Sequence, residues 1–238
     1  MQQKKWYLIL GLSVALTASV CSYLMQGEQT GIIATDAHGG ATGNGNRAQE
    51  QDGEGKRIAI TFDDGPHPSY TKQLLDGLAK RQVHATFFVI GRNIPGNEAL
   101  IARMEQEGHL IGNHTYDHVK ISNLSAEDAC EQVEKTSALV RGITGHDTEF
   151  IRPPFGEWND EMECSFEMIP VMWSVDPLDW TTKNTELIKE RVLEEAQDGD
   201  IILMHDYYQS SVDAALSVID SLGERGFEFV TVEELILE

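Results

Sequence analysis

Short apolar segments alternate with segments of helical periodicity over residues 56–238. The apolar segments are rich in β-branched and aromatic residues and therefore predict strands. They cover residues 58–62, 85–90, 109–111, 150–151, 171–175, 201–204 and 227–230. Elsewhere apolar residues recur every three or four positions, which predicts helices over 70–81, 97–107, 125–141, 185–196 and 212–225. This alternation is typical of βα units and of a largely parallel sheet.

The expected architecture is a single α/β domain over residues 56–238. About seven strands are predicted, one fewer than a complete eightfold barrel needs, so we expect a distorted (β/α) barrel. One domain fits better than two because polar motifs are spread over the whole segment. Ser125 followed by Asp128 resembles a capping box at the start of one helix, and Gly142 is expected to end that helix.

Acidic, histidine or arginine residues follow five of the predicted strands. They are Asp63 and Asp64, His114 and His118, Arg152, Asp176 and Asp179, and His205. In a βα-barrel the carboxyl ends of the strands meet at one mouth, where the active sites of such barrels form. The pattern therefore predicts one active site that draws on the whole domain.

Two adjacent carboxylates, Asp63 and Asp64, follow the first strand. In an extended strand their side chains would point to opposite faces, but a turn at Gly65-Pro66 can bring both toward one cavity. Their mutual repulsion requires a cation or an arginine nearby, and a buried Arg152 could serve. An acidic surface turn and a proline-stiffened loop are the structural alternatives for these two motifs.

His114 and His118 are four residues apart, which on a helical turn places both rings on one side. With one carboxylate they form a set of ligands that leaves open positions on a catalytic divalent metal. The same spacing also arises by chance. Because Thr115 follows His114, the pair lacks the glutamate base of the His-Glu-x-x-His metalloproteases.

His205 ends an apolar strand, so its ring should lie at the strand's exit. Histidine is well suited to donate a proton near neutral pH, and Asp179 or Asp206 could hold it as an imidazolium. A buried structural histidine is the alternative. Taken together, metal ligands, a spare carboxylate, an arginine and a separate histidine suit metal-assisted hydrolysis of an amide or an ester.

Five motifs in order resemble those of the NodB-homology polysaccharide deacetylases, carbohydrate esterase family four, which include peptidoglycan and chitin deacetylases. The resemblance covers residues 56–238. The motifs are TFDDGP at 61–66, HTYDH at 114–118, RPPF at 152–155, DPLDW at 176–180 and LMH at 203–205. The resemblance implies a distorted (β/α) barrel that removes acetyl groups from N-acetylated sugars.

The resemblance also implies a role for each motif residue. Asp64, His114 and His118 would bind a divalent metal, usually zinc and sometimes cobalt or nickel. Asp63 would be the general base that activates water, and His205 the acid that protonates the leaving amine.

By the same resemblance, Arg152 would position Asp63 and Asp179 would tune His205. The backbone N–H of Phe155 would stabilise the oxyanion, while Trp180 and Leu203 would pack around the acetate methyl. Family members often carry tyrosine where this chain has Phe155, so a hydroxyl contact to the sugar would be lost.

The N-terminal segment differs in composition from the rest of the chain. Residues 6–25 carry no charge and follow Lys4 and Lys5, which predicts a cytoplasmic segment 1–5 and a membrane anchor at 6–25. A cleaved signal peptide is the alternative. Residues 26–55 are rich in glycine and polar residues, which predicts a disordered tether.

An exported domain permits a disulfide between Cys130 and Cys164, although buried free thiols are equally compatible with the sequence. The 18 basic and 39 acidic residues argue against a nucleic-acid partner, because phosphates would be repelled. We expect a monomer at the cell membrane with its catalytic domain outside, or a secreted protein if the leader is cleaved.

Peptidoglycan is the expected substrate, because a membrane-tethered exported domain meets the cell wall first. N-acetylglucosamine is favoured over N-acetylmuramic acid, and chitin oligomers, acetylated xylan and a secreted exopolysaccharide are alternatives. Two other classes of protein compete with this hypothesis: a carbohydrate-binding module that has lost catalysis, and a metallopeptidase or amidase acting on wall peptides.

Overall fold

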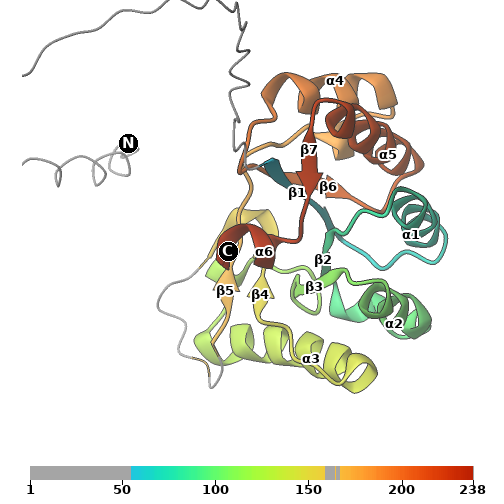
Figure 1. Ribbon diagram of the computed structural model, residues 1–238. Helices are drawn as coiled ribbons and strands as arrows, with labels where there is room; N and C mark the ends of the chain where they lie inside the picture. Colours follow the sequence, from blue (N-terminus) through green and yellow to red (C-terminus); the bar gives the residue numbers. More distant parts are fainter. Residues whose placement is uncertain (1–54, 159–163, 165–166, 238) are drawn as a thin grey trace, which may run out of the picture. The chain divides into compact units, whose positions relative to one another are not determined.

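The computed structural model describes residues 55–158, 164 and 167–237 (Figure 1). The predicted cytoplasmic segment, the membrane anchor and all of the tether except Gly55 lie outside these residues. Within the part of the chain that the structure describes, no helix has the length and apolar character needed to cross a membrane.

A curled parallel sheet forms the centre of the domain, and its strands run in the order β5-β4-β3-β2-β1-β6. A further strand, β7, pairs with the beginning of β1. Every pairing between neighbouring strands is parallel. The strands are β1 (Lys56–Asp63), β2 (Thr86–Val89), β3 (Leu110–Asn113), β4 (Phe150–Ile151), β5 (Ile169–Pro170), β6 (Ile201–His205) and β7 (Phe227–Phe229). The prediction of about seven parallel strands is thus confirmed.

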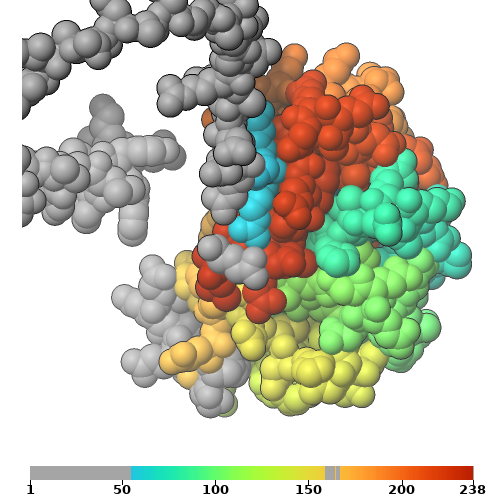
Figure 2. Space-filling view, viewed as in Figure 1, coloured from blue at the N-terminus to red at the C-terminus, as the bar shows by residue number. Residues whose placement is uncertain are grey.

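Helices α1 to α5 lie in an arc around the outside of the strands, in the spatial order α4, α5, α1, α2 and α3 (Figure 1). Their surfaces form a continuous layer in which α1 packs on both α2 and α5, and α2 packs on α3 (Figure 2). The helices are α1 (Tyr70–Arg81), α2 (Glu98–Gln106), α3 (Ala126–Thr144), α4 (Thr185–Glu195), α5 (Gln209–Glu224) and α6 (Val232–Leu237). Among the described residues, short 3₁₀ helices lie in the connections: η1 (Gly91–Asn93), η2 (Ile121–Asn123), η3 (Pro154–Gly156) and η4 (Asp179–Thr181).

The two faces of β1 have different partners because successive side chains of a strand point in opposite directions. Ile58, Ile60 and Phe62 belong to the main hydrophobic core, which also contains the apolar residues of α1 and α5. Thr61 and Asp63 alternate with them and therefore face the interior of the curled sheet. The apolar layer beneath the helices thus fixes which residues of β1 point toward the site.

The same alternation continues in β6, which lies beside β1. Thr61 is in register with Leu203, and Asp63 is in register with His205. Leu203 and His205 consequently share the inner face with Thr61 and Asp63. The sheet register thereby brings an acidic residue and a histidine to the same end of two neighbouring strands.

The prediction of a strand over 171–175 is wrong, since the regular strand β5 covers only Ile169–Pro170. The N–H of Val171 donates to β4, whereas the N–H of Val175 donates to Ile201 of β6 at 3.2 Å. Because the chain passes from one strand to another within these residues, it cannot remain a straight strand. Val175 forms an isolated bridge with Ile202 of β6. Residues 171–175 therefore connect β5 and β6, which lie at the two ends of the strand order.

Helix α3 ends three residues later than the sequence predicts. Gly142 lies inside the helix, and Gly145 ends it with a left-handed φ of 83°. Ile143 packs on the main core, so the additional turn buries apolar surface. The predicted start is confirmed, because the Ser125 hydroxyl accepts a hydrogen bond from the N–H of Asp128 at 3.1 Å.

A disulfide joins Cys130 of α3 to Cys164, which resolves the choice that the sequence left open. The two cysteines are 34 positions apart in the chain. A crosslink across a loop of this length restricts the unfolded chain and so stabilises the folded one.

We expect the double variant Cys130→Ser/Cys164→Ser to lose about 2–4 kcal/mol of unfolding free energy because the unfolded chain gains entropy. Urea denaturation followed by circular dichroism measures this loss. A reductant should destabilise the wild-type protein to the same degree and leave the double variant unchanged. An unfolding midpoint of the wild type that does not respond to reductant would contradict the prediction.

Candidate active site

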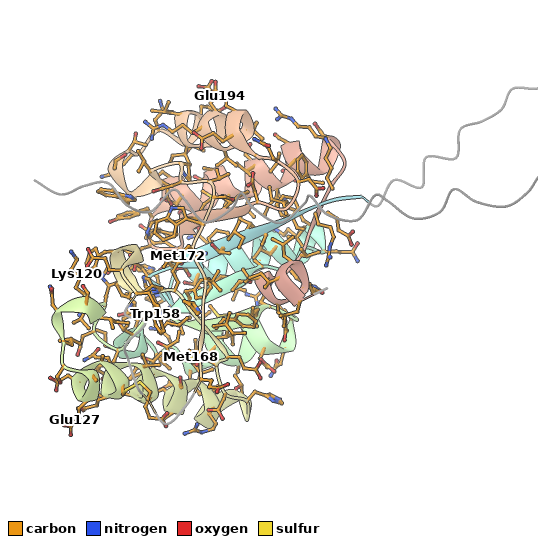
Figure 3. The ribbon with its side chains drawn as sticks, turned by 90° about the vertical axis from the view of Figure 1, so that its left-hand side faces the viewer. Lys120, Glu127, Trp158, Met168, Met172 and Glu194 are labelled. Atoms are coloured by element: carbon orange, nitrogen blue, oxygen red, sulfur yellow. A yellow bond between two sulfur atoms is a disulfide. The ribbon has the colours of Figure 1, made fainter. Side chains whose placement is uncertain are left out.

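The carboxyl ends of the strands carry the polar residues that the sequence singled out. The loops after β1, β3, β4 and β6 all open toward this end, as the parallel pairing requires. The loops after β3 and β4 are joined by an ion pair between Lys120 Nζ and Glu157 Oε1 at 2.5 Å. Figure 3 shows Lys120 on the side of the molecule toward which β1 runs.

Three residues at this mouth form a metal triad, which we define as Asp64, His114 and His118. The Oδ1 atom of Asp64 lies 3.6 Å from Nε2 of His114 and 3.4 Å from Nε2 of His118. This oxygen is buried and has no hydrogen-bond partner among the described residues. An unsatisfied buried carboxylate oxygen between two imidazole nitrogens fits a divalent cation, because burial of such an atom without a partner is costly.

The backbone of Asp64 explains how two adjacent carboxylates reach one cavity. Its φ of 75° lies in the left-handed region, which breaks the strand alternation directly after Asp63. The Asn93 amide donates to the Asp64 carbonyl at 2.8 Å, and the Ile90 N–H donates to the Gly65 carbonyl at 2.9 Å. The predicted convergence of the two carboxylates is confirmed, and these contacts hold the turn.

The two histidines of the triad converge through a loop, so the expected helical turn is wrong. Thr115 and His118 both have positive φ, at 62° and 55°, and the His114 and His118 ring centroids are 4.9 Å apart. His114 Nδ1–H donates to the Arg152 carbonyl at 2.6 Å, which leaves its Nε2 free to act as a ligand. Burial, and next the neighbouring His114, lower the pKa of His118, which favours the neutral ring that a metal requires.

Arg152 is fully buried and forms an ion pair with Asp63, the residue that the resemblance implies it positions. Its Nη1 donates to Asp63 Oδ1 at 2.8 Å and to the Thr61 hydroxyl at 2.6 Å. Its remaining donors reach the carbonyls of Val171 and Met172, each at 3.2 Å. Burial lowers the pKa of Arg152, while the charge of Asp63 opposes that shift. The second Asp63 oxygen, Oδ2, lies 3.7 Å from His114 Nε2, beside the metal triad.

His205 is paired with Asp179, which decides between the two partners that the sequence allowed. His205 Nδ1 lies 2.7 Å from Asp179 Oδ1, and its backbone N–H donates to Asp179 Oδ2 at 2.9 Å. Asp206 accepts a hydrogen bond from the Thr71 hydroxyl instead. Burial alone would lower the pKa of His205, but the hydrogen bond and charge of Asp179, aided by Asp63, raise it to about 9. The imidazolium form therefore predominates at neutral pH.

The three residues expected to line the substrate pocket differ in exposure. Phe155 is 63% exposed and packs edge-on against His118, with ring centroids 4.9 Å apart. Trp180 is 58% exposed in η4, directly after Asp179. Leu203 is buried on the inner face of β6. The structure thus brings Phe155 against the metal triad and places Trp180 and Leu203 on the elements that position His205.

A model of the family described as polysaccharide deacetylase matches residues 50–168. Over 180 residues, 76% of the chain, the sequence is 42% identical to peptidoglycan-N-acetylmuramic acid deacetylase PdaC of Bacillus subtilis. Over the same share it is 38% identical to peptidoglycan-N-acetylglucosamine deacetylase PgdA of Listeria monocytogenes. The chain belongs to the polysaccharide deacetylase family. The resemblance inferred from the five motifs is confirmed.

The fold agrees with that of a solved polysaccharide deacetylase. The structure of PdaC from Bacillus subtilis superposes with a TM-score of 0.74 at 41% identity, covering 76% of this chain and 90% of that one. The chain spans about two fifths of the length of the two curated relatives, 38% of PdaC and 39% of PgdA.

Sequence reasoning missed two asparagines that hold this polysaccharide deacetylase site in shape. Asn93 supports the Asp64 carbonyl, and the Asn113 side-chain oxygen accepts the Thr115 N–H at 2.8 Å. Asn113 also donates to the Val133 carbonyl in α3 at 2.9 Å. Its position at a strand end, directly before His114, was the available signal. Asn93 gave no such signal, because its connection to Asp64 depends on the packing of β1 against β2.

Removal of one triad ligand should abolish metal binding. We expect His114→Ala to lower zinc affinity at least about a hundredfold, since loss even of a residue that only orients a ligand costs 10–100-fold. Isothermal titration with zinc measures the affinity. His146→Ala removes an exposed histidine away from the site and should bind zinc as the wild type does. Equal zinc affinity in His114→Ala and the wild type would contradict the triad.

Loss of the Asp179 charge should lower the pKa of His205. In Asp179→Asn we expect it to fall from about 9 toward the ordinary value of 6.5, because the stabilisation of the imidazolium is lost. An NMR titration of the histidine rings follows this change. Asp176→Asn removes a carboxylate from the same loop and should leave the His205 titration nearly unchanged. A His205 pKa that stays near 9 in Asp179→Asn would contradict the assignment.

Proposed function

We propose that this chain is a metal-dependent hydrolase that removes N-acetyl groups from a cell-surface polysaccharide. The observation that carries the proposal is the arrangement at the mouth. A metal triad stands next to a carboxylate fixed by a buried arginine, and a charged histidine lies on the neighbouring strand. Such an arrangement supplies a base and an acid on either side of a scissile bond.

Zinc is the proposed metal, with cobalt or nickel as alternatives. Two imidazoles and one carboxylate suit zinc in catalytic sites and leave positions open for other ligands. When bound, the ion would polarise the acetamide carbonyl and lower the pKa of water. Asp64, His114 and His118 would hold it.

Asp63 is the proposed general base. Its ion pair with Arg152 holds one carboxylate oxygen, so the other faces the metal triad and is free to accept a proton. The proton comes from the water molecule that attacks the acetamide carbonyl carbon. A base fixed in position contributes about 10²–10⁴ in rate.

His205 is the proposed general acid. Its Nδ1 is occupied by Asp179, so its Nε2–H is the proton available to the leaving group. As the carbon–nitrogen bond breaks, this proton passes to the sugar nitrogen, and acetate and a free amine result. The raised pKa of His205 keeps that proton in place at neutral pH before the reaction.

The residues near the metal triad would bind the acetyl group. The Phe155 N–H would donate to the oxygen that becomes negatively charged as water adds to the carbonyl. Trp180 and Leu203 would surround the acetyl methyl, for which an apolar wall is suited. The exposed Phe155 ring would contact the sugar without the hydroxyl that a tyrosine offers.

The N-acetylglucosamine residues of peptidoglycan are the proposed substrate. The names of the relatives PdaC and PgdA support peptidoglycan but divide between N-acetylmuramic acid and N-acetylglucosamine. Chitin oligomers, an exopolysaccharide and acetylated xylan are the alternatives. We further propose a monomer anchored in the cell membrane by residues 6–25, with a tether over 26–55 and the catalytic domain outside the cell. Secretion after cleavage of a signal peptide is the alternative.

A carbohydrate-binding module without catalysis and a peptidase of wall peptides are less well supported. A module that had lost catalysis would not need to keep a fixed base, a charged acid and a ligand triad together. A peptidase of the His-Glu-x-x-His type would need a glutamate where this chain has Thr115. Asp63 and His205 are in register on neighbouring strands, so the acetamide of a sugar would lie between them.

Acetate release tests the proposed function. We expect the wild-type protein to release acetate from peptidoglycan, to lose this activity in a chelator and to recover it with zinc. Asp63→Asn should keep its zinc and lose about 10²–10⁴-fold in kcat, because only the base is removed. Chitin oligomers, acetylxylan and purified wall peptides are assayed in parallel. No acetate from any acetylated glycan, or near wild-type turnover in Asp63→Asn, would refute the proposal.

A further inference from the structure

Four aromatic rings form a continuous cluster in the segments that follow β1 and β6, which we call the aromatic ladder: Tyr70, His67, Tyr207 and Tyr208. The His67 ring stacks on Tyr70 with centroids 4.4 Å apart and an interplanar angle of 21°. Tyr207 packs edge-on against His67 at 5.1 Å, and Tyr208 packs edge-on against Tyr207 at 5.7 Å. The proposed reaction uses none of these rings.

The ladder is built on a fixed support. His67 Nδ1 accepts the N–H groups of Ser69 and Tyr70, each at 3.2 Å, and the His67 N–H donates to the Thr71 hydroxyl at 2.7 Å. Tyr207 and Tyr208 nevertheless remain 45% and 39% exposed. Exposed aromatic surface on a fixed support binds with little loss of conformational entropy.

The order of the strands places the ladder at one end of the site. His67 and Tyr70 follow β1, and Tyr207 and Tyr208 follow β6, its neighbour. The loops after β3 and β4, with the metal triad histidines and Phe155, lie on the other side of β1. The triad histidines and Phe155 therefore follow β3 and β4, whereas the aromatic ladder follows β1 and β6. Exposed aromatic rings thus occur in the loops after both β4 and β6.

We propose that the aromatic ladder is a sugar-binding subsite for the glycan residue that neighbours the one being deacetylated. The inference rests on the proposed function. A polymer whose acetamide lies between Asp63 and His205 must extend beyond the site. Tyr207 lies two positions after His205 in the chain, just past the end of the same strand. The CH groups on one face of a pyranose would pack against the Tyr207 ring, and the phenol hydroxyl groups of Tyr207 and Tyr208 can bond to the sugar.

The occupant is a neutral pyranose rather than a charged group. The ladder offers aromatic faces and phenol hydroxyls, which match the apolar face and polar edge of a sugar ring. Among the described residues no Lys or Arg is recorded in an ion pair or ring contact with any of the four rings. Aromatic rings without a cationic neighbour favour stacking on a sugar ring over binding of a charged group.

Binding measurements on a catalytically impaired protein test this subsite. In the Asp63→Asn background with zinc bound, Tyr207→Ala should weaken binding of the N-acetylglucosamine tetrasaccharide about tenfold, as loss of a stacking ring does. Binding of monomeric N-acetylglucosamine should change less than twofold. Tyr207→Phe should retain tetrasaccharide affinity within about threefold, because the ring remains. Isothermal titration supplies these affinities.

Two further variants keep the test decisive. Tyr208→Ala should also weaken tetrasaccharide binding more than monomer binding, but by a smaller factor than Tyr207→Ala. It replaces Tyr207→Ala in the test if thermal melting shows that Tyr207→Ala does not fold. Ile236→Ala removes an exposed apolar side chain from α6 and should leave both affinities unchanged. Equal losses for the monomer and the tetrasaccharide, or no loss for either, would overturn the subsite.

The outcomes separate this inference from the proposed function. Tetrasaccharide binding that depends on Tyr207 in a protein that releases no acetate from any glycan would refute the function and support the subsite. If the wild type releases acetate but Tyr207→Ala binds the tetrasaccharide as tightly as its parent, the subsite alone is refuted.

Discussion

The buried ion pair between Arg152 and Asp63 is the interaction on which the mouth of this domain depends. Removal of one partner from such a pair typically costs about 3–5 kcal/mol, because the other charge is left buried and unpaired. Arg152 also accepts the Nδ1–H of His114 through its main-chain carbonyl. One residue therefore fixes the proposed base with its side chain and orients a proposed metal ligand with its backbone.

The site contains two ion pairs, one between Arg152 and Asp63 and one between Asp179 and His205. Arg152 donates a hydrogen bond to Asp63, whereas Asp179 favours the charged imidazolium of His205. Environments that hold one group as a base and its neighbour as an acid are characteristic of sites for general acid–base chemistry. The parallel register of β1 and β6 sets the two groups side by side. The charged partners and the register of the two strands together place the proposed base beside the proposed acid.

The site could be predicted to a large extent because its residues lie at strand ends, which an apolar pattern locates well. Asp63, Asp64, Arg152 and His205 all follow apolar runs, and the structure brings them to one mouth. The local geometry of His118 could not be predicted, because the sequence spacing fits a helical turn as well as the observed loop. This loop requires positive φ values at Thr115 and His118, and contacts such as that of the Thr115 N–H with Asn113 support it.

The sequence by itself determined the βα order, the family and the residues at the strand ends, because these depend on local periodicity and on short motifs. Only the tertiary structure decided that Asp179 and not Asp206 pairs with His205, and that Cys130 bonds to Cys164. It also decided that residues 171–175 pass from β4 to β6, and that Tyr207 packs on His67. These are contacts between distant parts of the chain. Their partners are chosen by burial and by the closing of the sheet, which no local pattern encodes.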